Sequence, residues 1–400
     1  MKTTEVKCAM NLGSAFRFKW MIQGRKRVAD TGAESILAAK GIHVVDPEEV
    51  FTQAYVKHQV PEHLLKKSNS EEAHANVPKQ KPCYIFHKRF SPIAGISQVQ
   101  HITNSVVRNE LPESILGVIK ENSTEEDEYV KESIVHAHLL DSHQEKLPRI
   151  IDVVNRPGWS FPREYGIPLW RKNNSLTYQL QLILDKNNQQ PTSRYFLENG
   201  KSQVSFNHFG EFCHMIHEAA FILVSTKCIN PILSNDKINE TKIEVIPDIY
   251  PLSPLINCHP QTKYELKESS SVPNSNLYPH TVHVHHNQPI VRMKDDEFYA
   301  RSLIHSFSHA AAYAKSYSKQ TDGILEKPVV LQCVHNIKEK YHFSVFQLNT
   351  LDLTSSIKNV FWTQPYLHLF NDCIFKGGMP KLEGYNPQVF KMLKAFHIQA

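Results

Sequence analysis

The feature that most restricts the fold is a pair of strand-forming segments joined by a short polar turn. Residues 328–334 and residues 341–348 are rich in Val and Phe, and this arrangement predicts an antiparallel β-hairpin. The apolar face of a hairpin must be buried against other elements. The predicted core residues of this hairpin are Val330, Phe343, Val345 and Phe346.

Helices are predicted before this hairpin. Pro92 suits the first position of a helix whose apolar residues recur from Ile93 to Val106. A short second helix is expected over 113–120, after Pro112. Thr124 is expected to cap a third helix, because an acidic residue follows three positions later. The ordered body is expected to begin at Cys83, with the apolar segment 84–86 as a buried strand or anchor, and to continue as a helical region.

Later segments mix the two kinds of element. Strict alternation of Leu176, Tyr178, Leu180, Leu182 and Leu184 with the residues between them predicts a half-buried strand, and 208–224 is predicted to be helical. The two prolines of 250–254 exclude regular structure there. The remaining expected elements are a polar loop at 265–276, a long amphipathic helix capped by Asp295 and running to about 318, a third strand at 360–362 and a short helix at 387–397. The predicted class is α+β, with a helical first half of the body followed by an antiparallel sheet with packed helices.

The basic charge of the chain is concentrated at its start. The whole chain has 45 Lys and Arg against 40 Asp and Glu, a net charge of +5. Residues 1–27 hold seven of these basic residues and one acid, which leaves 38 basic and 39 acidic residues in the rest. A basic, acid-poor segment with spaced apolar residues is typical of a mitochondrial transit peptide. The alternative is a basic arm that touches RNA or lipid.

Three regions follow from these patterns. Residues 1–29 are expected to be a transit peptide and 30–82 an extended basic arm, with one short helix at 33–39 that Gly41 caps. Residues 83–400 are expected to form a single globular α+β domain. No apolar run approaches the roughly 18 residues that a membrane span requires.

Two histidine clusters were considered as metal sites. His283 and His285 would share one side of a strand, and His214 and His217 would be neighbours on a helix. The first cluster has no matching carboxylate nearby in sequence, and the second does not have the spacing of the zinc protease motifs. The alternative is that these histidines are packed or lie at the surface. The seven cysteines include no CxxC pair, and no phosphate-binding glycine motif occurs. We therefore expect no catalytic residue, cofactor or metal.

Basic side chains before residue 90 are the remaining candidates for function. Lys88-Arg89 lies beside Tyr84, Phe86 and Phe90, a combination that suits RNA, although a solvated loop would look the same. The candidate RNA-contact residues are Lys66, Lys67, Lys79, Lys81, Lys88 and Arg89.

Several long segments together resemble a family of mitochondria-specific ribosomal proteins. They are 83–89, 250–256, 278–281, 326–332, 342–353 and 360–362, and they occur in the family's order across 83–400. The family belongs to the large subunit of the mitochondrial ribosome and includes two paralogues. Residues 30–82 match it poorly.

The resemblance implies a structural ribosomal protein that supports mitochondrial translation within a ribonucleoprotein of the matrix, and it supplies no catalytic residue. Its implied partners are other large-subunit ribosomal proteins, including the paralogue, and the ribosomal RNA. A near-neutral body fits a peripheral protein held mainly by other proteins, since a deeply RNA-embedded one would be strongly basic. The alternative from another class is a histidine-based, metal-dependent hydrolase of the matrix.

Overall fold

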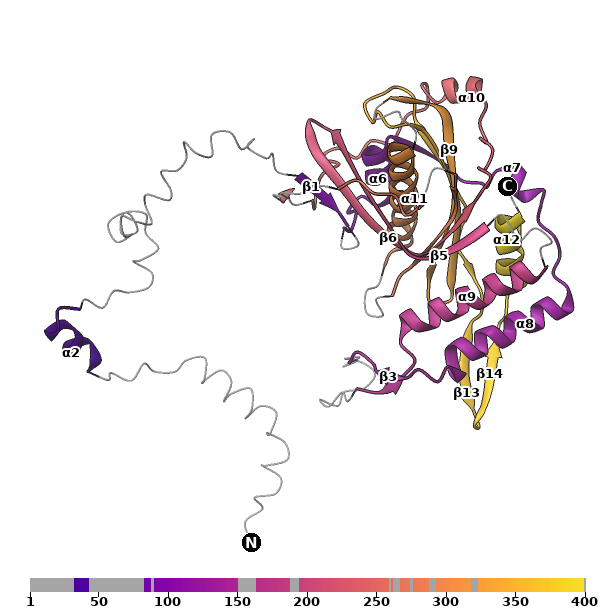
Figure 1. The fold of residues 1–400 in the computed structure, drawn as a ribbon, viewed down its shortest axis with the longest axis horizontal. Coiled ribbons are helices and arrows are strands. Elements are labelled where there is room, and N and C mark those ends of the chain that lie inside the picture. Colours follow the sequence, from indigo (N-terminus) through magenta and orange to yellow (C-terminus); the bar gives the residue numbers. More distant parts are fainter. Residues whose placement is uncertain are drawn as a thin grey trace, which may run out of the picture. The chain divides into compact units, whose positions relative to one another are not determined.

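The computed structural model describes residues 32–42, 83–87, 90–149, 163–187, 194–258, 260–261, 267–273, 276–287, 293–317 and 323–398 (Figure 1). The chain divides into two compact units, of which the first comprises residues 1–79 and 151–161 and the second the remainder. The predicted transit peptide, 1–29, lies outside the described residues, as does the predicted arm, 30–82, apart from 32–42.

One helix is described in the first unit. Helix α2 (Ala33–Ala39) ends at Gly41, which has a φ of 74°. The backbone N–H of Ile42 donates to the carbonyl of Leu37 at 2.9 Å, and that of Gly41 donates to Ala38 at 3.0 Å. This pair of bonds is the Schellman ending that favours glycine, so the predicted helix and its glycine cap are confirmed.

Ten strands of the second unit form one mixed sheet. They are β1 (Cys83–Phe86), β2 (Ser105–Arg108), β5 (Arg194–His208), β6 (Glu211–Ser225), β7 (Pro260–Gln261), β8 (Tyr278–His285), β9 (Ile324–Ile337), β10 (Lys340–Thr350), β11 (Asn359–Thr363) and β12 (Leu367–His368). The order is β2-β11-β10-β9-β8-β6-β1-β7, with β5 paired to β6 and β12 paired to β10. The pairs β1–β6, β8–β9 and β2–β11 are parallel, whereas the other pairs are antiparallel.

Strand β6 is long enough to pair with two strands along one edge. Its beginning pairs with β1, where Cys83 lies opposite Phe212. Its end pairs with β8, where His283 lies opposite Phe221. Strand β5 runs along the other edge.

Helices cover both faces of this sheet. The described helices are α6 (Gly95–Thr103), α7 (Glu113–Leu116), α8 (Thr124–Val135), the π-helical turn η2 (His136–Leu140), α9 (Leu169–Asn187), α10 (Asn235–Glu240), α11 (Asp295–Tyr317) and α12 (Pro387–Ile398). Two small two-stranded antiparallel sheets complete the unit, β3 (Glu145–Lys146) with β4 (Tyr165–Gly166), and β13 (Asp372–Lys376) with β14 (Met379–Glu383).

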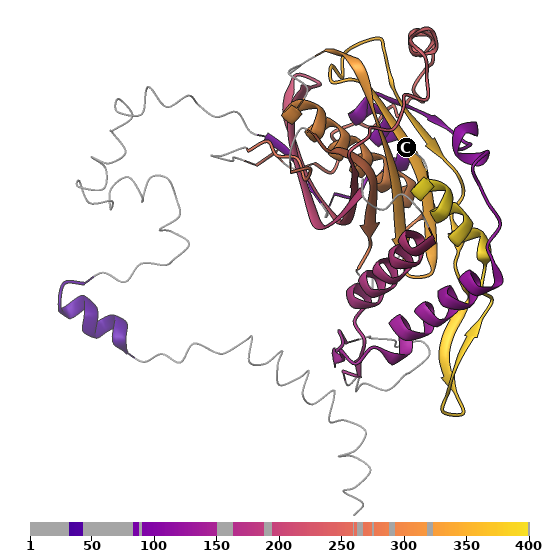
Figure 2. The same cartoon turned by 45° about the vertical axis from the view of Figure 1, so that its right-hand side comes forward.

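Alternate side chains of β10 reach the two layers of helices. Phe343 and Val345 pack into the apolar cluster built by α8, α9 and α12, and the rings of Phe343 and Phe396 meet edge to face at 5.3 Å. Phe346 enters the opposite cluster, built by α6 and α11, where its ring lies 6.1 Å from that of Phe307. Figure 2 shows α9, α8 and α12 together on the side of the sheet away from α11.

Most of the predicted elements after residue 290 are confirmed. The hairpin β9–β10 and the third strand β11 are antiparallel neighbours, and all four predicted core residues of the hairpin are buried. Helices α11 and α12 match the predictions within a few residues. The strand at 83–86 and the irregular segment 250–254 are also as predicted, and so is the α+β class. The sheet differs from expectation in having three parallel pairs.

The prediction of a strand over 176–184 is wrong. These residues lie in the 19-residue helix α9. Leu176, Leu180 and Leu184 recur every fourth residue and are buried, whereas Tyr178 and Leu182 are 48% and 51% exposed. The alternating residues therefore include Leu176, Leu180 and Leu184, which form an apolar stripe on one side of a helix. Packing of that stripe against α8 and the sheet favours the helix over the strand.

The prediction of a helix over 208–224 is also wrong. The chain forms the hairpin β5–β6, which turns at Phe209 and Gly210, both with positive φ. The apolar run is long because both faces of β6 are covered. The ring of Phe221 stacks on Phe196 at 4.6 Å, and Ile222 packs with the cluster of β8 and β9.

Smaller differences concern where helices begin and end. Helix α6 starts at Gly95 and stops at Thr103, so Val106 belongs to strand β2. Helix α7 is only four residues long. Ser123, one residue before the predicted cap, closes a capping box with Glu126 at the start of α8. Asp295 is the first residue of α11 and not its cap.

Candidate functional site

None of the six candidate RNA-contact residues can be placed. Lys66, Lys67, Lys79, Lys81, Lys88 and Arg89 all lie outside the described residues.

The histidines of β8 lie on a strand, as predicted, and are held by protein groups. The Nε2 of His285 lies 3.0 Å from the hydroxyl of Thr177, and its Nδ1 lies 2.9 Å from the side-chain oxygen of Asn174. His283 is 7% exposed and meets the ring of Phe196 edge to face at 6.0 Å. Burial lowers the pKa of His283 to about 4 and that of His285 to about 3, so both rings are neutral at pH 7.

The second predicted pair, His214 and His217, lies on strand β6 and not on a helix. Residues three apart on a strand point to opposite faces, so the two rings do not converge. The Nδ1 of His214 lies 2.9 Å from the hydroxyl of Ser205. His217 faces α11, where its ring lies 4.6 Å from that of His305.

A buried polar layer lies between α11 and the sheet, and the sequence analysis missed it. The hydroxyl of Ser302 lies 2.9 Å from Nδ1 of His335 on β9 and 2.8 Å from Nδ1 of His342 on β10. The Nε2 of His342 also lies 2.6 Å from the hydroxyl of Thr363. The spacing of Ser302, His305, Ser306 and His309 along α11 is the pattern that could have predicted this layer.

These buried histidines do not form a metal centre. Across the described ranges, no group of three or more His, Cys, Asp or Glu side chains could hold a metal ion. Burial lowers the pKa of His217, His309 and His342 to about 3, and that of His305 and His335 well below the usual value. The rings therefore act as neutral packing groups in the layer.

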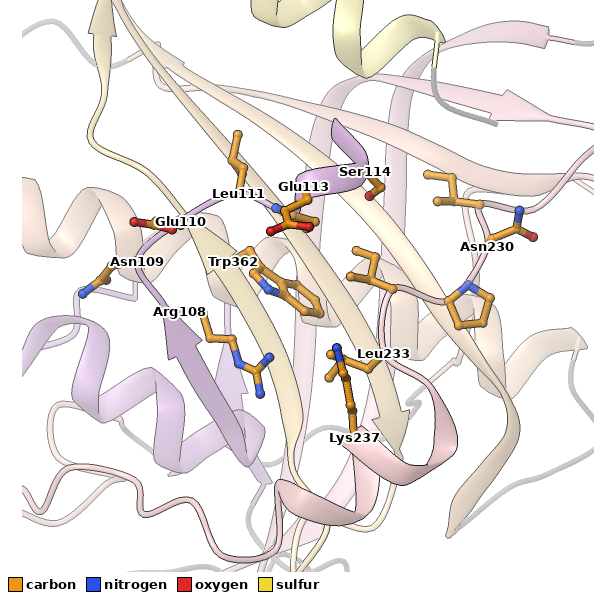
Figure 3. A pocket seen from close by; sticks show the side chains of 14 residues that line it. Arg108, Asn109, Glu110, Leu111, Glu113, Ser114, Asn230, Leu233, Lys237 and Trp362 are labelled. Atoms are coloured by element: carbon orange, nitrogen blue, oxygen red, sulfur yellow. The ribbon is translucent and has the colours of Figure 1, made fainter. Parts of the chain in front are cut away.

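A groove of about 900 Å³ lies where β2 ends (Figure 3). Three separate parts of the chain form it: residues 108–114, residues 229–237 and Trp362 of β11. Because β2 and β11 are parallel neighbours, Arg108 lies directly beside Trp362 in register. Its guanidinium lies 5.9 Å from the centre of the Trp362 ring and forms an ion pair with Glu244 at 2.8 Å.

The floor of the groove is apolar, and charged side chains of both signs lie beside it. Trp362 and Leu233 lie on the floor, each 5% exposed. Figure 3 shows Glu110 and Glu113 on one side of Trp362, and Arg108 and Lys237 on the other. None of the fourteen residues that line the groove is a histidine or a cysteine. The groove therefore has the character of a binding surface, and its lining offers no imidazole or thiol group.

Part of the backbone along each wall is unpaired within the described residues. Asn109, Glu110 and Leu111 make no backbone hydrogen bond to any residue that the structure describes, and neither does Asn230. On the 229–233 wall, the N–H groups of Ile232 and Leu233 donate to the side-chain oxygen of Gln347 at 2.8 and 3.0 Å. These bonds fix the position of that wall.

Comparison with known proteins identifies relatives of this chain. The chain is 27% identical over 294 residues to large ribosomal subunit protein mL37 of Rattus norvegicus, a match that covers 71% of this chain and 66% of the rat protein. It is 26% identical to the mL37 protein of Mus musculus over the same shares, and 24% identical to that of Gallus gallus over 80% of this chain and 75% of the chicken protein. The chain spans about two thirds of the length of the first two. No family model matches it.

Within the described residues, no helix has the length and apolar content to cross a membrane.

Proposed function

We propose that this chain, which is homologous to large ribosomal subunit protein mL37, is a structural constituent of the large subunit of the mitochondrial ribosome. In this role it supports mitochondrial translation and catalyses no reaction of its own. The observation that carries the proposal is the similarity to mL37 proteins over 71–80% of the chain. A groove without histidine or cysteine, and histidines used for packing, agree with a scaffold role.

Sedimentation tests this proposal directly. A mitochondrial lysate is separated on a sucrose gradient and the fractions are probed for the chain. The expected result is a peak with the large ribosomal subunit that persists at moderate salt. A peak at the top of the gradient, in a lysate whose large subunits are intact, would contradict the proposal.

Import into the matrix is part of the same proposal. Residues 1–27 carry a net charge of +6 beside an otherwise near-neutral chain, which supports a cleaved transit peptide ending near Arg27. N-terminal sequencing of the chain from purified mitochondrial ribosomes is expected to begin close to this residue. Recovery of an intact Met1 from those ribosomes would refute cleavage.

RNA binding is proposed for the basic residues before position 90, while the body binds mainly neighbouring proteins, including the paralogue in the same subunit. The support is the distribution of charge. Each basic residue that contacts phosphate adds about one unit to the slope of log affinity against log salt. Neutralising all six candidates is therefore expected to weaken binding to naked ribosomal RNA and to flatten its salt dependence. The variant carries changes at Lys66, Lys67, Lys79, Lys81, Lys88 and Arg89.

A matched control has six exposed lysines of the body neutralised instead. They are Lys120, Lys131, Lys146, Lys201, Lys227 and Lys242. If the control loses as much affinity as the first variant, folding has gathered the RNA-binding charge on the body, and the proposal for the arm is wrong.

A further inference from the structure

We infer that the groove at the end of β2 binds an extended segment of a neighbouring protein, in which an apolar residue lies between an acidic and a basic residue. The inference rests on the proposed function for the kind of assembly that supplies this neighbour. All fourteen residues that line the groove belong to the second compact unit and are described by the structure.

The floor determines the central residue of the partner segment. Trp362 and Leu233 lie at the base of the hollow but are each only 5% exposed, so the accessible apolar surface comes mainly from Pro231 and Ile232. Arg108 is already occupied, since its guanidinium pairs with Glu244 and lies over the Trp362 ring. The uncovered surface between the walls therefore suits an aliphatic or aromatic side chain.

The charges on the walls determine the flanking residues. Lys237 lies on α10, and it forms no ion pair with any residue that the structure describes. The same is true of Glu110 and Glu113 on the facing wall. A segment with an acid toward Lys237 and a base toward the two glutamates would satisfy all three charges.

The acidic wall also argues for polypeptide rather than RNA. A phosphate backbone in the groove would lie beside Glu110 and Glu113, and like charges at short range are repelled. An extended polypeptide can instead pair with the unbonded backbone groups of Asn109 to Leu111, in the manner of a strand added at an edge. Strand β2 is the outermost strand at this end of the sheet, which leaves its outer side open to such pairing among the described strands.

An exposed apolar rim extends the surface. Ile243 and Val245 flank the Glu244 that pairs with Arg108, and they are 85% and 87% exposed. Two adjoining apolar side chains with this exposure are expected to be covered in an assembly. The partner segment would therefore continue past the groove on the side of Arg108.

Site-specific cross-linking in the assembled particle tests the inference. A photoreactive benzophenone amino acid is placed at Asn109 or at Asn230, which are exposed residues on opposite walls. The full-length chain is expressed in its own cells, large subunits are purified, and cross-linked peptides are identified by mass spectrometry. A third chain carries the probe at Lys201 on β5, at the far edge of the sheet, as the control position.

The expected result is that both groove positions cross-link to one segment of one ribosomal protein with the predicted order of charged and apolar residues. Lys237→Glu is expected to lower this yield at least about tenfold, because one ion pair becomes a repulsion. Reversing the acidic residue of the partner is expected to restore it. The cross-links from Lys201 should be unchanged. Lys237 is exposed, so its variant is expected to keep the wild-type melting temperature.

Other results would overturn the inference. These are cross-links to ribosomal RNA, cross-links scattered over several proteins, no cross-link from either groove position in particles that contain the chain, and a yield that Lys237→Glu leaves unchanged. Failure of the proposed function is a separate result, because the wild-type chain would then be missing from the large-subunit fractions before any probe is introduced.

Discussion

Moderate acid is predicted to unfold this protein, because many of its histidines are buried in the neutral form. Eight of them are at most 7% exposed and have a pKa lowered by burial, and six of these have no carboxylate partner among the described residues: His217, His283, His305, His309, His335 and His342. In the unfolded chain, each has a pKa of about 6.5. As the pH falls below 6.5, the unfolded state takes up protons that the folded state excludes, and the free energy of unfolding decreases.

The size of the effect follows from this difference in proton binding. At pH 6.0, protonation favours the unfolded state by about 0.8 kcal/mol for each histidine, or about 5 kcal/mol for all six. At pH 5.5, the total rises to about 8 kcal/mol, which approaches the whole stability of a typical domain of about 5–15 kcal/mol. The pKa values of these histidines in the folded state, about 3 to 4 for four of them, lie well below pH 5.5. Protonation of the folded state therefore does not reduce the loss of unfolding free energy between pH 6.5 and 5.5.

Urea unfolding at pH 7.5 and 6.0, followed by tryptophan fluorescence, measures the effect. The free energy of unfolding is expected to fall by about 5 kcal/mol between these two values. His309→Gln removes one ring that is protonated only in the unfolded chain in this pH range, and it should reduce the fall by about 0.8 kcal/mol. A fall smaller than about 1 kcal/mol in the wild-type chain would refute the reasoning, since it would mean that the rings are protonated in the folded state.

Three further predictions concern stability, each measured as a change in the urea midpoint. Phe346→Ala empties a fully buried site between the sheet and α11 and should cost about 3–5 kcal/mol; an unchanged midpoint would show that the ring is not packed as described. Ser123→Ala removes the capping box of α8 and should cost about 1 kcal/mol, while an effect of zero would place the start of the helix elsewhere. Gly95→Ala would force Ala to a φ of 57° and place its Cβ against the carboxylate of Asp296. It should therefore lower the free energy of unfolding clearly more than Gly210→Ala, where φ is 76° and the space around the Cβ is open. Equal losses for the two variants would contradict the close approach of Gly95 to Asp296.

The sequence predicts the elements whose local pattern agrees with their tertiary surroundings. The hairpin β9–β10 combines β-branched and aromatic residues with a polar turn, and no competing pattern occurs there. Helix α11 has apolar residues around most of its circumference because it is buried against the sheet and α6. In both cases the propensity, the pattern and the burial favour the same structure.

The two large errors have a common physical origin. The alternating Leu and Tyr residues of 176–184 also include residues spaced four apart, so a helix and a strand can both bury part of the set. Strand β6 is buried on both faces, and this removes the alternation that would distinguish it from a helix. Which structure forms depends on neighbours more than 50 residues away, such as β8 beside β6.

The candidate groove could not be predicted from local sequence. Arg108 and Trp362 are separated by more than 250 residues and become neighbours only through the parallel pairing of β2 with β11. Lys237 comes from a third part of the chain. The polar layer under α11 was easier to predict from the sequence. Ser302, His305, Ser306 and His309 have the spacing that places residues on one side of a helix.

The position of α12 has a consequence for synthesis of the protein. This helix follows every strand of the sheet, yet Phe390 and Phe396 are fully buried in the cluster on one face of that sheet. A growing chain therefore cannot close this face until residues 387–398 have been made and released. A chain interrupted before residue 387 would present the uncovered apolar surface of β10, including Phe343, to chaperones and proteases.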